Sequence, residues 1–453
     1  MMMLIGVLGT FVCLFLILLS RRLRAAHPAA NPQPVLSDVQ LGEVSYHDID
    51  MLKAIPSQPT LENYVVIGGS GFLGMYIVRL LILRGETKIR VLDLHPPHPD
   101  IASNPSVSYI KTDVTSLQSV RDGLTQPFSD GSGLPTVIYH TAAIIRFWER
   151  ASYTWETSYN VNVQGTANVL SVAKKMPNTI LVYTSTADTC IPRSKFLRLG
   201  LDYKIPPYHK VTISDDDSPL KPSQSSQSCY TRSKLLAEQL VIGANGWNGL
   251  KTGIIRPGCT IMGPNDRILA STLTMARVPV FDKVWSATNV CVWDVAAAHL
   301  LHEDALRRNP EESAGQAFLI SGKGPAWRLN DIRNAVKYYS SRPLLFDEVP
   351  PLLVYILAHF VEFLLFIRYY ALLPFYVLRG SKLRLYPEWM GQLVYMQPST
   401  LEYMRDIVID DSRAQKILGY RPQWSTVQCI RYTVDEMQSG RAREGHGLQL
   451  KSD

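Results

Sequence analysis

The chain has 453 residues, of which 46% are hydrophobic and 19% charged, and its formal net charge at pH 7 is +7. This composition excludes a disordered chain, a collagen and a simple coiled coil, and the length suits two or three domains or one large elaborated fold. The mean hydropathy of 0.00 is high for a soluble enzyme, so some apolar sequence must lie outside an ordinary core. The weak, scattered positive charge favours a membrane surface over nucleic acid as a partner.

An almost unbroken apolar run occupies residues 1–19 and ends just before Arg21-Arg22-Leu23-Arg24. About 20 apolar residues are needed to cross a bilayer as a helix. The run lacks a basic start and a directly following Ala-x-Ala-like site, which favours a signal anchor over a cleaved signal peptide. Ala25-Ala26 and Ala29-Ala30 leave that alternative open. Because the arginines follow the run, the rest of the chain is expected in the cytosol.

Strands and helices alternate after a segment rich in Pro, Ser and Asp that we interpret as a linker. The predicted strands are residues 64–67, 89–93, 107–110, 137–140 and 179–184, and a helical run covers 75–84. Such alternation is typical of an α/β fold in which helices cover both faces of a parallel sheet.

A glycine motif, Gly68-Gly69-Ser70-Gly71-Phe72-Leu73-Gly74, lies between the first strand and the helical run. Small residues there allow a tight turn and the close approach of a pyrophosphate, which then lies on the helix N-terminus. Asp93 ends the next strand, 19 residues after Gly74, where its carboxylate can accept hydrogen bonds from both ribose hydroxyls. The same carboxylate would repel a 2′-phosphate, so NAD is predicted in preference to NADP. Asp113-Val114, after the third strand, could face the adenine.

The sequence Tyr230-Thr231-Arg232-Ser233-Lys234 precedes a helical run over residues 235–242. A spacing of four places the phenol and the ammonium about one helical turn apart on one face. The cation stabilises the phenolate, which suits Tyr230 to acid or base chemistry near neutrality. A hydroxyl is expected at a strand end to hold the substrate oxygen, and Thr184-Ser185-Thr186 supplies three candidates.

A second apolar region covers residues 349–378 and contains Glu362 and Arg368. Burying these charges at the centre of a bilayer would cost a few kcal/mol each. A crossing would also place everything after Arg379 on the other side of the membrane. We therefore expect a helix or hairpin in the membrane interface, with a buried core helix as the alternative.

Cysteines and histidines give no sign of a disulfide framework or a metal site. The six cysteines are scattered, with no pair at the spacing of zinc or redox motifs. His299 and His302 are three residues apart on a predicted helix, but no third ligand accompanies them. We expect reduced thiols, as in a protein that faces the cytosol, and no metal.

In the order of these motifs the chain resembles the extended short-chain dehydrogenase/reductases, from about residue 64 to residue 437. Besides the glycine motif and the Tyr-x-x-x-Lys pair, the resemblance rests on Thr141-Ala142-Ala143, Asn162-Val163-Gln164-Gly165-Thr166, Arg256-Pro257-Gly258, Gly263-Pro264 and residues 414–422. Residues 230–238, Val292-Trp293-Asp294-Val295 and the late apolar region are most similar to the 3β-hydroxysteroid dehydrogenase branch. Within that branch the similarity is to the sterol-4α-carboxylate 3-dehydrogenases (decarboxylating).

The resemblance implies that Tyr230 is the acid/base, that Lys234 supports it and holds the nicotinamide ribose, and that Thr186, beside Ser185, orients the substrate oxygen. It implies cofactor contacts by Gly68, Gly71, Phe72, Leu73, Gly74, Asp93, Asp113, Val114, Thr141, Ala142, Ala143, Asn162, Tyr230, Lys234 and Pro257. Two departures concern the substrate pocket. Thr replaces the commoner Ser at position 186, and the stretch from Cys190 to Cys229 is longer than usual. We interpret its Asp215-Asp216-Asp217 run as a solvated loop.

We therefore predict a Rossmann-type doubly wound parallel sheet with a smaller C-terminal substrate-binding region. The expected activity is NAD-dependent oxidation of the 3β-hydroxyl of a sterol or triterpenoid, with decarboxylation of a 4-carboxy substrate. The expected place is the endoplasmic reticulum membrane, with the catalytic domain facing the cytosol; contact with other sterol-modifying enzymes and a homodimer are compatible with it. A nucleotide-sugar epimerase or dehydratase and a non-catalytic dinucleotide-binding protein stay as alternatives.

The expected divisions of the chain are an anchor at 1–24, a linker at 25–60, the NAD-binding domain with part of the substrate region at 61–348, a membrane-associated segment at 349–380, the rest of the substrate region at 381–440 and a tail at 441–453.

Overall fold

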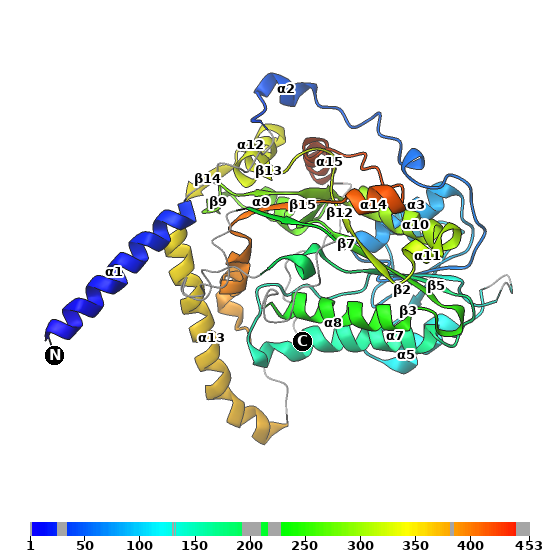
Figure 1. The fold of residues 1–453 in the computed structure, drawn as a ribbon, viewed down its shortest axis with the longest axis horizontal. Helices are drawn as coiled ribbons and strands as arrows, with labels where there is room; N and C mark the ends of the chain where they lie inside the picture. The colour runs from blue at the N-terminus through cyan, green and yellow to red at the C-terminus, as the bar shows by residue number, and fades with distance from the viewer. Residues whose placement is uncertain are drawn as a thin grey trace.

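Seven parallel strands form the central sheet of the computed structural model, which describes residues 2–24, 34–128, 131, 133–192, 210–215, 228–380 and 385–440 (Figure 1). The strand order is β12-β7-β5-β4-β1-β2-β3. The strands are β1 (Tyr64–Ile67), β2 (Ile89–Asp93), β3 (Val107–Lys111), β4 (Val137–His140), β5 (Ile180–Thr184), β7 (Lys251–Pro257) and β12 (Gln316–Ile320). This order confirms the predicted doubly wound Rossmann-type sheet. The chain adds β2 and β3 on one side of β1 and the later strands on the other side, starting with β4. Sheets of this kind bind their ligands at the point between β1 and β4 where the strand order reverses.

Helices cover both faces of this sheet because its central strands are apolar on both faces. On one face pack α3 (Phe72–Arg84) and α10 (Val292–Arg308), and on the other α5 (Leu117–Thr125), α7 (Gly165–Ala173) and α8 (Cys229–Ala244) (Figure 1). On β5 the buried side chains alternate: Val182 belongs to the core of the α10 face, and Leu181 and Tyr183 belong to that of the α8 face.

A smaller region is built from short strands at the carboxyl side of the main sheet. A four-stranded sheet has the order β13 (Trp327–Arg328), β10 (Ser286–Ala287), β15 (Asp406–Ile409), β6 (Lys210–Ile213), and two strand pairs are β8 (Thr260–Met262) with β11 (Asn289–Cys291) and β9 (Arg277–Val280) with β14 (Leu345–Glu348). Strand β6 comes from the long stretch after Cys190. The remaining elements are α2 (Asp38–Glu43), η1 (Met51–Ala54), α4 (Pro99–Ala102), η2 (Ser152–Thr154), α6 (Trp155–Ser158), η3 (Tyr159–Gln164), η4 (Ala187–Cys190), η6 (Trp247–Gly249), α9 (Arg267–Thr274), α11 (Pro310–Ser313), α12 (Leu329–Tyr339), η7 (Glu388–Tyr395), η8 (Pro398–Tyr403), α14 (Ser412–Ile417) and α15 (Thr426–Gln438).

The predicted linker at 25–60 is wrong for its described part, residues 34–60, which packs on the body of the protein. Tyr46 donates a hydrogen bond from its hydroxyl to Asp435 of α15, at 3.1 Å. Four apolar side chains of this segment are buried in the same core as β1 and α10: Leu41, Met51, Ala54 and Ile55. Met51, Ala54 and Ile55 have helical spacing but make a single turn, which is too short a signal to distinguish this segment from a linker without its distant partners.

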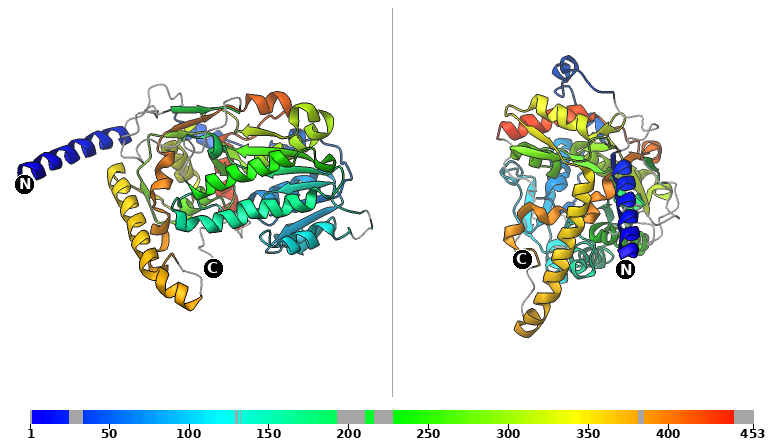
Figure 2. Two further views of the ribbon diagram at one scale, coloured as in Figure 1. Left: turned by 60° about the horizontal axis from the view of Figure 1, so that its bottom comes forward. Right: turned by 90° about the vertical axis from the view of Figure 1, so that its left-hand side faces the viewer.

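Two apolar helices lie on one side of the molecule, α1 (Met2–Arg24) and α13 (Pro351–Arg379) (Figures 1 and 2). Leu19 and Leu23 of α1 are buried against the start of α13. Among the described residues, α13 is the one helix that is long and apolar enough to cross a membrane; the apolar stretch of α1, Gly6–Arg21, is shorter. The anchor at 1–24 and the interfacial position of 349–380 stay predictions.

Two charged side chains of α13, Glu362 and Arg368, point to the protein body. Glu362 accepts two hydrogen bonds from the guanidinium group of Arg150, each of 2.6 Å, and Arg368 donates to the carbonyl of Leu385 at 3.1 Å. The strands on either side of α13, β14 and β15, both pair with strands of the smaller region. Both ends of α13 therefore return to one folded body.

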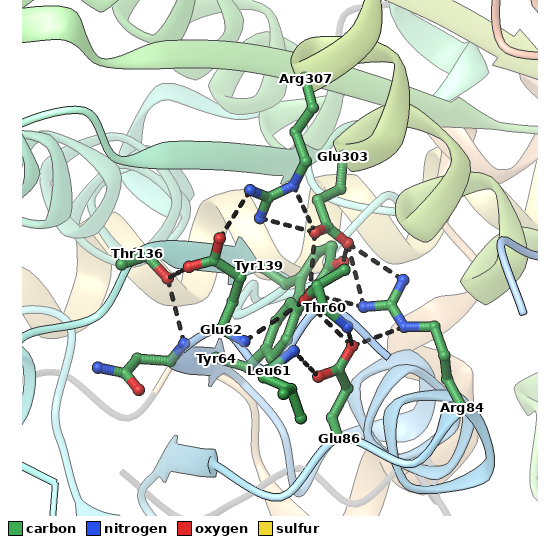
Figure 3. Close-up of polar contacts among 11 residues, drawn as sticks. Thr60, Leu61, Glu62, Tyr64, Arg84, Glu86, Thr136, Tyr139, Glu303 and Arg307 are labelled. Atoms are coloured by element: carbon green, nitrogen blue, oxygen red, sulfur yellow. Dashed lines mark hydrogen bonds and ion pairs between the residues drawn. The ribbon is translucent and has the colours of Figure 1, made fainter. Parts of the chain in front are cut away.

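A buried polar network joins α10 to β1, β4 and the end of α3 (Figure 3). The carboxylate of Glu303 accepts from the hydroxyls of Tyr64 (2.9 Å) and Tyr139 (2.7 Å) and pairs with Arg84 (3.4 Å) and Arg307 (3.0 Å). Its side chain is 1% exposed. Because every charge in it has an opposite partner, the network fixes these elements to one another rather than offering a binding site.

Candidate active site

The glycine motif forms a tight turn between β1 and α3. Gly68 has a φ of +83°, which few other residues adopt without strain. A Cβ atom at Gly74 would lie 2.1 Å from the carbonyl oxygen of Gly68, so the first turn of α3 touches the backbone of the turn. The N-terminus of α3, capped by Gly71, is left open to a phosphate group. This cradle, which side chains at these positions would fill, fits a dinucleotide.

Residues after β4 hold the glycine turn from the neighbouring strand. Thr141 donates from its hydroxyl to the carbonyls of Ile67 (2.9 Å) and Gly68 (3.2 Å). A Cβ atom at Gly68 would lie 2.6 Å from the backbone nitrogen of Ala142. The structure thus brings Thr141 and Ala142 to the glycine motif, and Ala143 follows them.

Asp93 lies on the other side of the glycine turn, at the carboxyl end of β2. Its carboxylate accepts from the backbone N–H groups of Ser70 (3.1 Å) and His95 (3.3 Å). Burial raises the pKa of Asp93 above its usual value, although these two hydrogen bonds act in the opposite direction. The carboxylate is therefore fixed beside the turn, where the sequence placed the adenosine ribose.

The other predicted cofactor residues divide into two groups. Asp113 uses its carboxylate to close the loop after β3, accepting from the N–H (2.9 Å) and hydroxyl (2.8 Å) of Thr115. Val114 packs against α7, and the side chain of Leu73 is buried in the core, so only its backbone could face a cofactor. The remaining two stand at the same edge of the sheet, where α3 begins and where β7 ends: Phe72 and Pro257.

Helix α8 begins at Cys229 and carries both Tyr230 and Lys234, in agreement with the one helical face predicted from their spacing. Ser228 caps the helix, its hydroxyl accepting from the N–H of Thr231 at 3.1 Å. Lys234 is 2% exposed, and its ammonium donates to the carbonyl of Thr184 (2.8 Å) and the hydroxyl of Tyr183 (3.1 Å). These bonds hold Lys234 at the carboxyl end of β5, one helical turn from the buried Tyr230.

Burial lowers the pKa of Lys234 to about 7, and Glu238, one turn further along α8, opposes this shift. Glu238 pairs with Arg256 of β7 through two hydrogen bonds of 3.0 and 2.8 Å. Tyr230, Lys234 and Glu238 therefore share one face of α8. Glu238 was not among the residues predicted from the sequence, although its spacing of four from Lys234 places it on the same helical face.

The interpretation of Asp215 as part of a solvated loop is wrong. Its side chain is 1% exposed and pairs with Arg256 at 3.1 Å, and it also accepts from the backbone N–H of Leu319 on the edge strand β12. Asp215 and Glu238 thus together balance the charge of Arg256. The pairing of Asp215 with Arg256 cannot be predicted from the sequence. Asp216 and Asp217 lie outside the described residues.

The three hydroxyls at the end of β5 have different partners. The ring of His299 has its pKa lowered by burial to about 4, and its Nδ1 bonds to the carbonyl of Val295 at 2.7 Å, so its Nε2 accepts the proton of Thr184, also at 2.7 Å. The hydroxyl of Thr184 therefore points to α10 and donates its proton to His299. Thr186 accepts from the N–H of Asp188 at 3.3 Å and keeps its own proton to donate. Ser185 lies between them, and its hydroxyl has no hydrogen-bond partner in the described part of the chain.

Asn162, which is expected to contact the cofactor, makes hydrogen bonds to other residues of the protein. It lies in η3, a π-helical turn that interrupts the helical segment leading into α7. Its amide accepts from the N–H of Ile144 (2.9 Å) and donates to the carbonyl of Ile144 (3.0 Å) and the hydroxyl of Ser233 (2.8 Å). Asn162 therefore joins the segment after β4 to α8, beside Lys234.

The histidines of α10 serve the core. His302 bonds from Nε2 to the carbonyl of Ser313 at 3.1 Å, and His299 bonds to Thr184 as described above. Within the described ranges, no group of three or more His, Cys, Asp or Glu side chains is placed to hold a metal ion.

Residues 65–337 match the model of the 3-beta hydroxysteroid dehydrogenase/isomerase family. Sterol-4-alpha-carboxylate 3-dehydrogenase, decarboxylating, of Candida albicans is 25% identical over 397 residues, which cover 83% of this chain and 98% of that protein. The 3 beta-hydroxysteroid dehydrogenase type 7 of Rattus norvegicus is 26% identical over 378 residues, covering 83% and 95%. The 3beta-hydroxysteroid-dehydrogenase/decarboxylase isoform 1 of Arabidopsis thaliana is 26% identical over 403 residues, covering 84% and 80%.

Among solved structures, UDP-glucose 4-epimerase of Thermotoga maritima superposes with a TM-score of 0.57 at 16% identity, covering 84% of this chain and 99% of that one. The Thermus thermophilus UDP-glucose 4-epimerase, solved as a complex with NAD, superposes with a TM-score of 0.55 at 18% identity, covering 83% and 99%. At these identities the likeness establishes the fold.

Proposed function

Because the chain belongs to the 3-beta hydroxysteroid dehydrogenase/isomerase family of NAD-dependent oxidoreductases, we propose that it oxidises the 3β-hydroxyl of a sterol or triterpenoid that carries a carboxylate at C4. The observation that carries this proposal is the position of Tyr230 one helical turn from a buried Lys234, whose ammonium is held at the end of β5 next to Ser185 and Thr186, at the edge of the sheet that bears the glycine turn. The similarity to the decarboxylating relative of Candida albicans along 98% of its length supports the 4-carboxy substrate.

In the proposed reaction Tyr230 removes the proton of the 3-hydroxyl, and Thr186 donates a hydrogen bond that orients the oxygen. The charged Lys234 stabilises the phenolate form of Tyr230. The hydride that leaves C3 would pass to bound NAD, which would supply the oxidising power for the step. The residues that would hold it are the glycine turn, Asp93 and Lys234. The product is a β-keto acid, which can lose carbon dioxide without further help from the protein.

The activity can be tested by incubating microsomes that contain the protein with NAD and a panel of sterols, and following NADH. We expect NADH from 3-hydroxy-4-carboxy sterols and none from UDP-glucose. Epimerisation of UDP-glucose without sterol oxidation would instead support the nucleotide-sugar alternative, which shares the fold. The apolar surfaces of α1 and α13 favour the lipophilic substrate.

We expect Asp93→Ala to reduce the preference for NAD over NADP, mainly by weakening the binding of NAD. The carboxylate, fixed by Ser70 and His95, would accept from the ribose hydroxyls and repel a 2′-phosphate. The check is kcat/KM for both cofactors in both proteins. Equal values for the two cofactors in the wild type would contradict this role of Asp93.

We also place the enzyme on the endoplasmic reticulum membrane, with α1 as the anchor and α13 along the cytosolic leaflet. Removing residues 1–18 keeps Leu19 and Leu23, which pack on the body. This truncated protein should stay partly membrane-bound and be released by detergent rather than by salt, since the apolar surface of α13 remains.

A glycosylation sequon engineered after Gly440 tests the same topology from the other end of the chain. We expect it to stay unmodified in microsomes, because both ends of α13 return to one folded body. Efficient glycosylation would show that α13 crosses the membrane.

A further inference from the structure

The loop of residues 146–155, between β4 and η3, is held on one side by α13 and the segment after it. Arg150 forms a two-pronged ion pair with Glu362, with both N–O distances 2.6 Å. Tyr153 stacks on Tyr369, with the ring centroids 4.5 Å apart and the planes at 16°. Tyr386 donates from its hydroxyl to the carboxylate of Glu149. Ion pairing, stacking and hydrogen bonding thus fix the same short loop to the apolar helix.

On its other side the same loop contacts the first residues of α8. The carbonyl of Glu149 accepts from the N–H of Cys229 at 2.6 Å. The guanidinium group of Arg232 lies over the ring of Trp155 at 4.6 Å. The first N–H groups of a helix have no partner within the helix, so this carbonyl determines how the chain enters α8. Cys229 directly precedes Tyr230, and the loop therefore connects α13 to the candidate acid/base.

The opposite face of α13 carries an apolar stripe that the protein leaves exposed. Six side chains spaced three and four residues apart, each 48–56% exposed, form it: Leu353, Ile356, Phe360, Phe363, Ile367 and Tyr370. Glu362 and Arg368 face the body instead. The neighbouring α1 exposes apolar side chains on several of its faces, which is typical of a helix in lipid rather than in a protein groove. The end of α1 meets the start of α13, and from there the two helices run apart on the same side of the molecule (Figure 1).

We propose that a lipid bilayer covers the stripe and that the 146–155 loop transmits the position of α13 to Tyr230, with Arg150 and Glu362 as positioning residues. The proposal rests on the proposed function, in which Tyr230 is the acid/base. When α13 is bound to lipid, it holds the Arg150–Glu362 ion pair and the stacked rings of Tyr153 and Tyr369 in place. The carbonyl of Glu149 then keeps the start of α8 fixed. Since a misplacement of about 1 Å can slow an enzyme about 100-fold, a small shift of Tyr230 is sufficient to couple lipid binding to turnover.

The test uses the full chain with phosphatidylcholine vesicles, and compares Arg150→Met, Glu362→Gln and the exchange variant Arg150→Glu/Glu362→Arg. Each single variant should lower kcat roughly 10-fold, with the Kd of NADH within about twofold of wild type. The exchange variant should regain most of the lost kcat. Arg277→Met, which breaks an exposed ion pair with Asp347 (66% and 43% exposed), is the matched control and should keep wild-type kcat.

Two further measurements separate coupling from a general loss of stability and from failure of the proposed function. Vesicles should raise kcat of the wild type and not of the single variants, although all of them float with the vesicles. Amide hydrogen exchange at residues 229–233 should be faster in the single variants, a result that needs no turnover and therefore holds even where no sterol is oxidised.

Single variants with wild-type kcat, lipid response and exchange would overturn the proposal. So would Phe360→Ser/Ile367→Ser, on the stripe, if it converted a dimer to a monomer without changing flotation, because a second copy of the chain would then cover the stripe.

Discussion

Replacing Tyr230 by phenylalanine should lower kcat at least about 100-fold while NADH still binds, because the phenol supplies the route for the proton of the substrate hydroxyl. The ring itself stays buried on α8, so the helix and Lys234 keep their places. The dinucleotide is held mainly by the glycine turn and Asp93, which the substitution does not touch. Steady-state kinetics and fluorescence titration with NADH measure the two effects separately.

The matched control is Tyr338→Phe, which removes the hydroxyl of an exposed tyrosine on α12. It should leave both kcat and NADH binding unchanged. If Tyr230→Phe kept a tenth or more of the wild-type kcat, Tyr230 would be misassigned as the acid/base.

The largest effect on stability is expected from Glu303→Ala, which should lower the free energy of unfolding by about 3–5 kcal/mol. The side chain lies at the centre of the network in Figure 3, where it faces two tyrosine hydroxyls and two guanidinium groups. Removing it leaves Arg84 buried with Glu86 as its remaining acidic partner. Because the network joins α10 to β1 and β4, losing its hydrogen bonds and ion pairs should destabilise the packing of α10 on the sheet. Chemical denaturation measures it, and Glu303→Gln provides a milder variant should the alanine form fail to fold.

Asp304 is the matched control, since it is the next residue of the same helix. It pairs with Arg308, whose side chain is 62% exposed. Exposed ion pairs contribute at most about 1 kcal/mol, so Asp304→Ala should have a correspondingly small effect. Similar losses from the two substitutions would show that the buried network does not stabilise the fold as described.

The sheet and the glycine turn could be predicted because their signals are local. A continuous apolar strand such as Tyr64–Ile67 carries its own length and burial pattern, and the strands predicted at 89–93 and 137–140 have the bounds seen in the structure. The pair Tyr230 and Lys234 could likewise be placed on one helical face from spacing alone.

The features that could not be predicted from the sequence depend on partners that are distant in the chain. Asp215 is buried because Arg256, 41 residues later, meets it at the edge of the sheet. The segment at 34–60 is part of the folded body because its few apolar side chains pack in the core that also contains side chains of α10 and α15. Asn162, in a π-helical turn, hydrogen-bonds to Ile144 and Ser233, 18 residues before it and 71 residues after it in the chain. The partner in each of these contacts cannot be identified from the residues next to it in the sequence.

The most direct test of the central claim follows a deuterium atom at C3 of a 4-carboxy sterol. The purified chain is incubated with NAD and the 3α-deuterated substrate, and deuterated NADH, carbon dioxide and the 3-keto sterol are measured together. We predict that the three products appear in equal amounts and that all three form at least about 100-fold more slowly with Tyr230→Phe. Carbon dioxide released without deuterium in the NADH, or no transfer of deuterium from any 3-hydroxy sterol, would contradict the assignment of the chain as a 3β-hydroxysteroid dehydrogenase that acts on 4-carboxy sterols.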